Sequence, residues 1–194
     1  MKRLLLLSVL PLTLLAACDE EETPAPEAVA MTEEALGHYC QMHLAEHAGP
    51  KAQVHLVGAP APLFFSQVRD AISYERMPEQ TAAIAAIYVN DMGRAPSWAD
   101  PGAENWIAAE AAHYVVGSAR VGGMGAAELV PFSDLEAAAA FAAEHGGRIL
   151  RLADIPDDQV LAPAETGIET ETGTGDGEQD FRERLERLST ERQG

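Results

Sequence analysis

Two sulfur side chains, Cys40 and Met42, lie close together in the sequence near the start of its apolar middle part. Because one residue separates them, the two sulfurs can share one face of an extended segment or converge in a tight turn. Nearby histidines add possible nitrogen donors: His38, His43 and His47. A thiolate and a thioether are soft donors, and soft donors select Cu(I). The pattern predicts a copper site; the alternative is core packing of the sulfurs, with histidines that are solvated or satisfied locally.

The cysteine count disfavours other chemistries. The chain has two cysteines, Cys18 and Cys40, and no Cys-x-x-Cys pair. A structural zinc site needs four N or S ligands, usually with paired cysteines, and iron–sulfur clusters need more cysteines still. A thiol-transfer enzyme needs a resolving cysteine. Nucleophile-elbow, phosphate-loop and dinucleotide-binding motifs are absent from the sequence, so we expect a protein that is not an enzyme.

The first 17 residues have the pattern of a bacterial lipoprotein signal peptide. Lys2 and Arg3 precede an apolar run over residues 4–15, which is shorter than the roughly 20 residues that a membrane-spanning helix needs. The run ends in Leu-Ala-Ala-Cys, a lipobox, so we expect cleavage before Cys18 and lipid attachment to that cysteine. The predicted location is the periplasm, anchored to a bacterial membrane.

Composition separates the two ends of the mature chain from its middle. Losing the signal peptide takes the formal net charge from −18 to −20, which argues against nucleic-acid binding. Residues 18–35 are rich in Glu, Pro and Ala, and we expect a solvated, disordered tether there. Residues 163–194 are predicted to form an acidic, largely disordered tail. Within that tail, residues 179–192 place Phe181, Leu185 and Leu188 at helical spacing.

The middle of the chain, residues 36–162, predicts an α+β domain built from a duplicated ββαβ unit. In the first unit, residues 36–95, strands are expected over 51–57, 62–65 and 84–89, with a helix capped by Ser66 and running towards Ser73. In the second unit, residues 105–155, strands are expected over 113–116, 128–132 and 148–152. Its helix is expected from a Ser133 cap, with a capping box to Glu136, to about Glu144, ending before Gly146. Both units place Phe-Ser where the second strand meets the helix.

Several separated motifs resemble the NosL family in the correct order. The first is Tyr39-Cys40-Gln41-Met42, followed by Glu46-His47-Ala-Gly-Pro-Lys-Ala-Gln53. Later motifs are Trp106 to Glu110, Tyr114 to Ser118, Gly123-Met124-Gly125, Val130-Pro131-Phe132 and Glu144 to Gly147. The resemblance spans residues 39–152, and the lipobox agrees with it because NosL proteins are typically lipoproteins. It also implies a fold of paired ββαβ units.

The resemblance implies a Cu(I) chaperone that supplies copper for maturation of nitrous oxide reductase. Expected partners are the reductase apoprotein and an ABC-type assembly that includes a periplasmic subunit. Cys40 and Met42 fall on the family's Cys-x-Met metal motif. Met124, in a glycine-rich loop, is the favoured third ligand, with His113, His43 and His47 as competitors. Gln41 departs from the pattern, since a small residue such as Gly is common there. The rival function is a lipid-anchored scaffold that transfers no metal.

Overall fold

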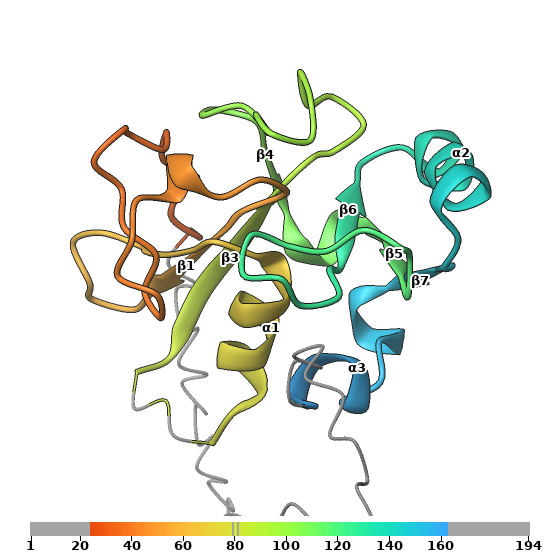
Figure 1. Ribbon diagram of the computed structural model, residues 1–194. Helices are drawn as coiled ribbons and strands as arrows, with labels where there is room; N and C mark the ends of the chain where they lie inside the picture. The colour runs from red at the N-terminus through yellow and green to blue at the C-terminus, as the bar shows by residue number, and fades with distance from the viewer. Residues whose placement is uncertain (1–23, 79, 81, 163–194) are drawn as a thin grey trace, which may run out of the picture.

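The computed structural model describes residues 24–78, 80 and 82–162 of the chain (Figure 1). The predicted signal peptide, the predicted lipid attachment at Cys18 and the predicted tail over residues 163–194 lie outside the described residues. Among the helices that the structure describes, none has both the length and the apolar character needed to cross a membrane.

The elements follow the order predicted from the sequence, with one strand added between the two units. The first unit contains η1 (Leu44–Glu46), β1 (Ala52–Leu56), β2 (Leu63–Phe65), α1 (Val68–Arg76) and β3 (Ile84–Asn90). Then come β4 (Trp106–Ala108) and the 3₁₀ turn η2 (Ala109–Ala111). The second unit contains β5 (His113–Val116), β6 (Val130–Phe132), α2 (Leu135–His145) and β7 (Arg148–Arg151), and η3 (Leu152–Asp154) and α3 (Asp158–Leu161) close the described chain.

The duplication is visible in the strand pairing. The first sheet has the order β2-β1-β3-β4 and the second β6-β5-β7, so in each unit the first strand lies between the other two. All pairs are antiparallel, and Phe65 lies opposite Ala52 as Phe132 lies opposite His113. The Phe-Ser motif therefore occupies equivalent positions in the two units. Strand β6, which contains Pro131, is an edge strand, as a proline without a backbone N–H requires.

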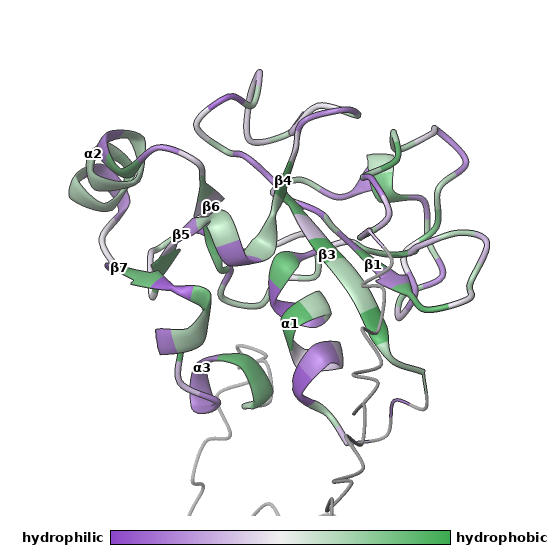
Figure 2. Cartoon of the chain, turned by 180° about the vertical axis from the view of Figure 1, so that it is seen from behind, coloured by the Kyte–Doolittle hydropathy of each residue, from purple (hydrophilic) through white to green (hydrophobic). Residues whose placement is uncertain are grey.

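The two units share one hydrophobic core. Alternate residues of β5 face two sides, so Tyr114 and Val116 join the main core while Val115 packs into a smaller cluster under α2. The main core also contains Val54, Ile72 and other buried residues of the first unit: Ala52, Phe65, Val68, Ala71 and Val89. Figure 1 shows α1 beside the first sheet and α2 at the outer edge of the second. In Figure 2, α1 mixes apolar and polar residues along its first turns and is polar at its C-terminal end.

Both predicted serine caps are wrong, because each serine has another partner. The N-cap of α1 is Gln67, whose side chain makes no cap hydrogen bond, and the Ser66 hydroxyl faces Cys40 instead. The N-cap of α2 is Asp134, whose carboxylate accepts from the backbone N–H of Glu136. The Ser133 hydroxyl donates a hydrogen bond to the buried carboxylate of Asp91, the residue after β3. The end of α2 at Gly146, with φ of 76°, is as predicted.

The segment just before the domain, the described residues 24–35, is largely exposed but contacts the first sheet, where a disordered tether was expected. The backbone N–H and C=O of Val29 bond to the side-chain amide of Gln53 at 2.9 and 3.0 Å. Tyr88 donates to the carbonyl of Pro26, and Met31 N–H donates to the carbonyl of Ala103. The buried amide of Gln53 offers one donor and one acceptor, as a neighbouring strand would. Composition alone could not reveal that pairing.

Candidate metal site

Cys40 and Met42 lie in one tight turn that is attached to β2. The N–H of Gly37 donates to the carbonyl of Met42 at 3.0 Å, and Gln41 N–H donates to the carbonyl of Gly37 at 2.8 Å. His38 N–H donates to the carbonyl of Phe64, which fixes the turn to the edge strand. Of the two geometries that the sequence allowed for Cys-x-Met, the structure therefore shows the tight turn.

Gln41 is the one non-glycine residue with a positive φ among the described residues, at 56°. This left-handed region suits glycine because Cβ is crowded there in other residues. Gln41 offsets part of that cost by donating its side-chain amide to the carbonyl of His38 at 2.6 Å. Gln41 thus preserves the turn and adds a hydrogen bond to it.

The Cys40 thiol points back across the turn towards the first helix. A Cβ placed on Gly37 would lie 2.5 Å from Cys40 Sγ, so only glycine leaves room for the sulfur. Cys40 is half-buried, and its Sγ lies 3.6 Å from the hydroxyl oxygen of Ser66. The thiol therefore faces the junction between β2 and α1.

Met124 lies in a short loop that docks on the same junction. Val121 and Ala127 form a bridge that closes the loop, and Gly125 N–H donates to the carbonyl of Gly122 at 2.9 Å. The N–H of Met124 donates to the side-chain oxygen of Gln67 at 3.1 Å. A Cβ on Gly123 would lie 2.9 Å from the carbonyl oxygen of Ser66. Ser66 and Gln67 thus contact Cys40 on one side and the Met124 loop on the other.

His47 closes the contact between the two sulfur-bearing segments. Its Nδ1 lies 2.9 Å from the carbonyl oxygen of Gly123. Because a carbonyl only accepts hydrogen bonds, Nδ1 carries the proton and Nε2 carries the lone pair. Nε2 is buried and has no hydrogen-bond partner. An imidazole oriented through one nitrogen to a backbone carbonyl, with the other nitrogen unpaired, is the usual state of a histidine that can bind a metal.

The other histidines are placed less favourably. His43 is exposed and bridges to Leu36 at the base of the turn. His113 begins β5 opposite Phe132 and Arg151, so its neighbours belong to the second sheet. His38 packs its ring against Phe65 and Tyr74, with centroids 5.5 and 5.7 Å away. Of the competitors named for the third ligand, His47 is the one in direct contact with the Met124 loop.

A buried polar network behind the loop was not predicted from the sequence. The carboxylate of Glu128 accepts from the backbone N–H groups of Arg69 and Leu129, so Glu128 supplies the cap that α1 lacks from its own N-cap residue. Its second oxygen has no partner and would lie 2.4 Å from a Cβ on Gly122. Lys51 donates to the carbonyls of His47 and Gly49, which holds the backbone beside the loop.

Burial sets the charge state of this network. The pKa of Glu128 is raised to about 8, chiefly because burial removes water from its carboxylate. The pKa of Lys51 is lowered to about 8 for the same reason, with attraction to Glu128 opposing the shift. Among the described residues no ion pair joins them. The burial of Lys51 and Glu128 has a signal in the sequence, because each is a charged residue at the start of an apolar stretch. No such signal marked Gln67.

Exposed apolar side chains surround the site. Met42 and Met124 are 40% and 43% exposed, so neither thioether is sequestered in the core. We call the surrounding surface the apolar rim, and it consists of five exposed side chains on the turn and the loop: Leu36, Tyr39, Met42, Val121 and Met124. Within residues 24–78, 80 and 82–162, no three His, Cys, Asp or Glu side chains are grouped to hold a metal ion.

Comparison with known proteins identifies the family of this chain. The sequence model of the NosL family matches residues 28–160. The copper-binding lipoprotein NosL of Achromobacter cycloclastes is 62% identical over 159 residues, which cover 81% of this chain and 82% of the relative. That of Stutzerimonas stutzeri is 36% identical over 158 residues, covering 80% of each chain. The crystal structure of the copper chaperone NosL from Shewanella denitrificans superimposes with a TM-score of 0.62 at 32% identity, covering 66% of this chain and 95% of that one.

Proposed function

Because this chain belongs to the NosL family, we propose that it is a lipid-anchored Cu(I) chaperone whose cargo is held between the Cys40 turn and the Met124 loop. Its relatives are named copper-binding lipoproteins, and a solved structure with the same fold is named a copper chaperone. The observation that carries the site is the shared support of the two segments. Ser66 contacts the Cys40 thiol, and Gln67 holds the backbone of Met124.

Three sulfur atoms form the proposed ligand set. Cys40 binds as thiolate, because a bound metal ion displaces the thiol proton. Met42 and Met124 add neutral thioethers, which favour Cu(I) and discriminate against zinc and harder ions. His47 is the alternative third ligand, since its unpaired Nε2 is buried beside the loop. Through this donor set the protein selects Cu(I) over Cu(II), and it binds the ion without a catalytic step.

An open ligand set allows copper to be released. The exposed thioethers leave one side of the proposed site accessible, so a ligand of the receiving protein can attack the ion there. The apolar rim supports this because contact between apolar surfaces excludes water while the metal changes ligands. A closed cage of four ligands would hold the ion too long for delivery.

The proposed recipient is the nitrous oxide reductase apoprotein, reached with an ABC-type assembly that has a periplasmic subunit. The proposed location is the periplasmic side of a membrane, with lipid attached at Cys18. The acidic surface of the chain is proposed to steer it towards a basic docking face. Steering of this kind weakens with salt, so binding to the purified periplasmic subunit should weaken as ionic strength rises. Binding that ignores ionic strength would contradict steering and leave metal binding intact.

Cu(I) titration against a competing chelator tests the chaperone against the scaffold. The proposal expects one tightly bound Cu(I) per chain, lost in Cys40→Ser and weakened in Met42→Leu and Met124→Leu. Met77→Leu is the matched control, because Met77 is similarly exposed at the end of α1 and outside the site. A scaffold would show no stoichiometric binding and no effect of Cys40→Ser.

Delivery is tested in a denitrifying bacterium that lacks its own copy of this protein. Expression of the wild-type chain should restore copper to the reductase, whereas Cys40→Ser, expressed and anchored equally, should not. Equal restoration by both chains would rule out a copper-delivery role that depends on Cys40.

A further inference from the structure

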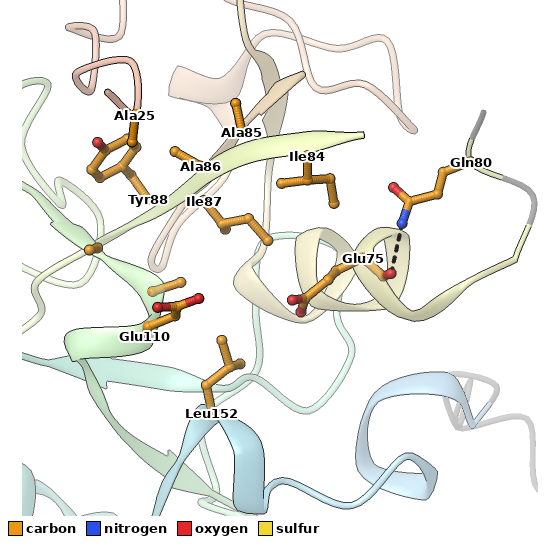
Figure 3. A pocket seen from close by; sticks show the side chains of 12 residues that line it. Ala25, Glu75, Gln80, Ile84, Ala85, Ala86, Ile87, Tyr88, Glu110 and Leu152 are labelled. Atoms are coloured by element: carbon orange, nitrogen blue, oxygen red, sulfur yellow. Dashed lines mark hydrogen bonds between the residues drawn. The ribbon is translucent and has the colours of Figure 1, made fainter. Parts of the chain in front are cut away.

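A groove lies between α1, β3 and η2, apart from the proposed copper site. It contains a pocket of about 440 Å³ whose apolar wall includes Ile84, Ile87 and Leu152. A second hollow shares Glu75, Glu110 and Leu152 with the first and extends along Arg76, Arg151 and Ala153. Figure 3 shows Glu75 and Glu110 projecting towards the pocket from opposite sides, with Ile87 and Leu152 pointing into the space between them. We call this surface the acidic groove.

Among the described residues, the two carboxylates of the acidic groove form no salt bridge. The neighbouring arginines are already engaged: Arg76 bonds to Asp157 and to two backbone carbonyls, and Arg151 donates to the carbonyls of Glu110 and Ala111. Partial burial and repulsion by Glu110 raise the pKa of Glu75, with Arg76 opposing. An apolar wall beside two carboxylates that form no salt bridge suits an apolar segment flanked by arginines.

The C-terminal end of this chain has that pattern. In a helix over residues 179–192, Phe181, Leu185 and Leu188 would share one face. Arg184 and Arg192 would lie on or beside that face, and Glu183 and Glu186 would lie away from it. The segment therefore combines apolar residues with positive charges opposite in sign to Glu75 and Glu110.

The described chain also ends close to the groove. Helix α3 packs on α1, and Arg69 of α1 donates to the carbonyl of Ala162, the last described residue. Arg76, on the last turn of α1, bonds to the carbonyl of Ile155 just before α3. Between Ala162 and Phe181 lie 18 residues, which can span about 60 Å when extended. The segment can reach the groove of its own chain.

We propose that residues 179–192 dock as a helix in the acidic groove of the same chain, with Leu185 in the pocket and arginines beside Glu75 and Glu110. The proposal does not depend on copper binding. It gives the tail a fixed position on the domain at a surface distinct from the Cys40 turn and the apolar rim.

Amide NMR spectra of the mature chain test the docking. Leu185→Asp should shift the amide signals of Glu75, Ile84, Ile87 and Glu110, because a buried carboxylate would expel the segment from the groove. Thr190→Asp is the matched control, since residue 190 lies opposite Leu185 on the helix, and it should leave those signals in place. Unchanged signals at Ala138 in the smaller core would show that the fold is intact.

Exchanging the charges of Glu110 and Arg184 gives a second test of the docking. Glu110→Arg should shift the same groove signals, and adding Arg184→Glu to it should restore them towards their wild-type positions. Groove signals that ignore Leu185→Asp would overturn the proposal. Leu185→Asp shifts that disappear when the protein is diluted would also overturn it, because the occupant would then be the tail of a second copy.

Discussion

The imidazole Nδ1 of His47 lies 2.9 Å from the backbone oxygen of Gly123. This one contact joins two loops that are 76 residues apart in sequence, one following the Cys40 turn and the other carrying Met124. It also fixes the tautomer of His47 and leaves Nε2 unpaired. Contacts within the chain therefore hold the proposed site in place before a metal binds. This lowers the entropy cost of ordering the ligands on binding.

Gly123→Ala should weaken Cu(I) binding by displacing the Met124 loop. The new Cβ would lie 2.6 Å from the Cβ of His47 and 2.9 Å from the carbonyl oxygen of Ser66, so the loop must move. We expect about a tenfold loss of affinity in a chelator competition. Gly125→Ala is the control: its φ of 81° brings strain, but no atom lies within 4 Å of the new Cβ. Equal affinities for wild type and Gly123→Ala would show that the loop is not a ligand support.

Replacing Gln41 by glycine should lower the stability of the fold less than replacing it by alanine. Alanine keeps the unfavourable positive φ and loses the hydrogen bond to His38, whereas glycine removes the backbone strain. We expect Gln41→Ala to be less stable than Gln41→Gly by about 1 kcal/mol in urea unfolding. The reverse order would mean that the turn does not hold this conformation in solution.

Asp91 should be one of the most sensitive polar residues of the fold. It is fully buried, and its carboxylate accepts from the N–H of Gly93 and from both the N–H and the hydroxyl of Ser133. Asp91→Ala leaves these donors without an acceptor and should lower the free energy of unfolding by about 3 kcal/mol. Asp134→Ala, which removes the N-cap of α2, should cost about 1 kcal/mol. Similar losses for the two variants would contradict the importance of the hydrogen bonds that Asp91 accepts from Gly93 and Ser133.

Glu128 should make the stability of the chain depend on pH. Its pKa is raised from 4.5 in the reference state to about 8 in the fold, so folding takes up a proton between these values. The contribution is therefore fully present below about pH 4.5 and is lost as the pH rises through about 8. Glu128→Gln should gain stability relative to wild type by about 2 kcal/mol across that window.

Urea unfolding at several pH values checks this dependence, with Glu104→Gln in an exposed loop as the control. The control should run parallel to wild type. Lys51, whose pKa is lowered to about 8, contributes in the opposite sense, since its penalty grows as the pH falls from 10.5 through about 8. Measurements from about pH 5 to 7 therefore isolate Glu128 best. Parallel curves for wild type and Glu128→Gln would refute the assignment.

Periodic apolar patterns predicted most of the elements, because alternation and helical spacing reflect burial directly. Six strands and the duplicated arrangement follow from them, whereas the two main helices were predicted from the serines expected to cap them and, for α2, from the glycines that follow it. Strand β4 was missed, since its three residues, Trp106 to Ala108, give too short a pattern. The serine caps were wrong for a different reason: Cys40 and Asp91, distant in sequence, take up the two hydroxyls.

The ligand types of the proposed site could be predicted from residue chemistry, but its supports could not. A thiol and thioethers indicate binding of a soft metal ion from their donor type alone. Gln67 and Glu128 instead act through the backbone N–H groups of Met124 and Arg69, and every residue except proline has such a group. Only the fold reveals those contacts.

X-ray absorption on the Cu(I)-loaded mature chain, compared with Met124→Leu, tests the proposed site most directly. Leucine preserves the bulk of methionine and removes its sulfur, so the loop should keep its place. We predict a copper shell of sulfur atoms in the wild-type chain, with one sulfur fewer in the variant. A shell of nitrogen and oxygen, or a sulfur count unchanged in Met124→Leu, would contradict the three-sulfur site.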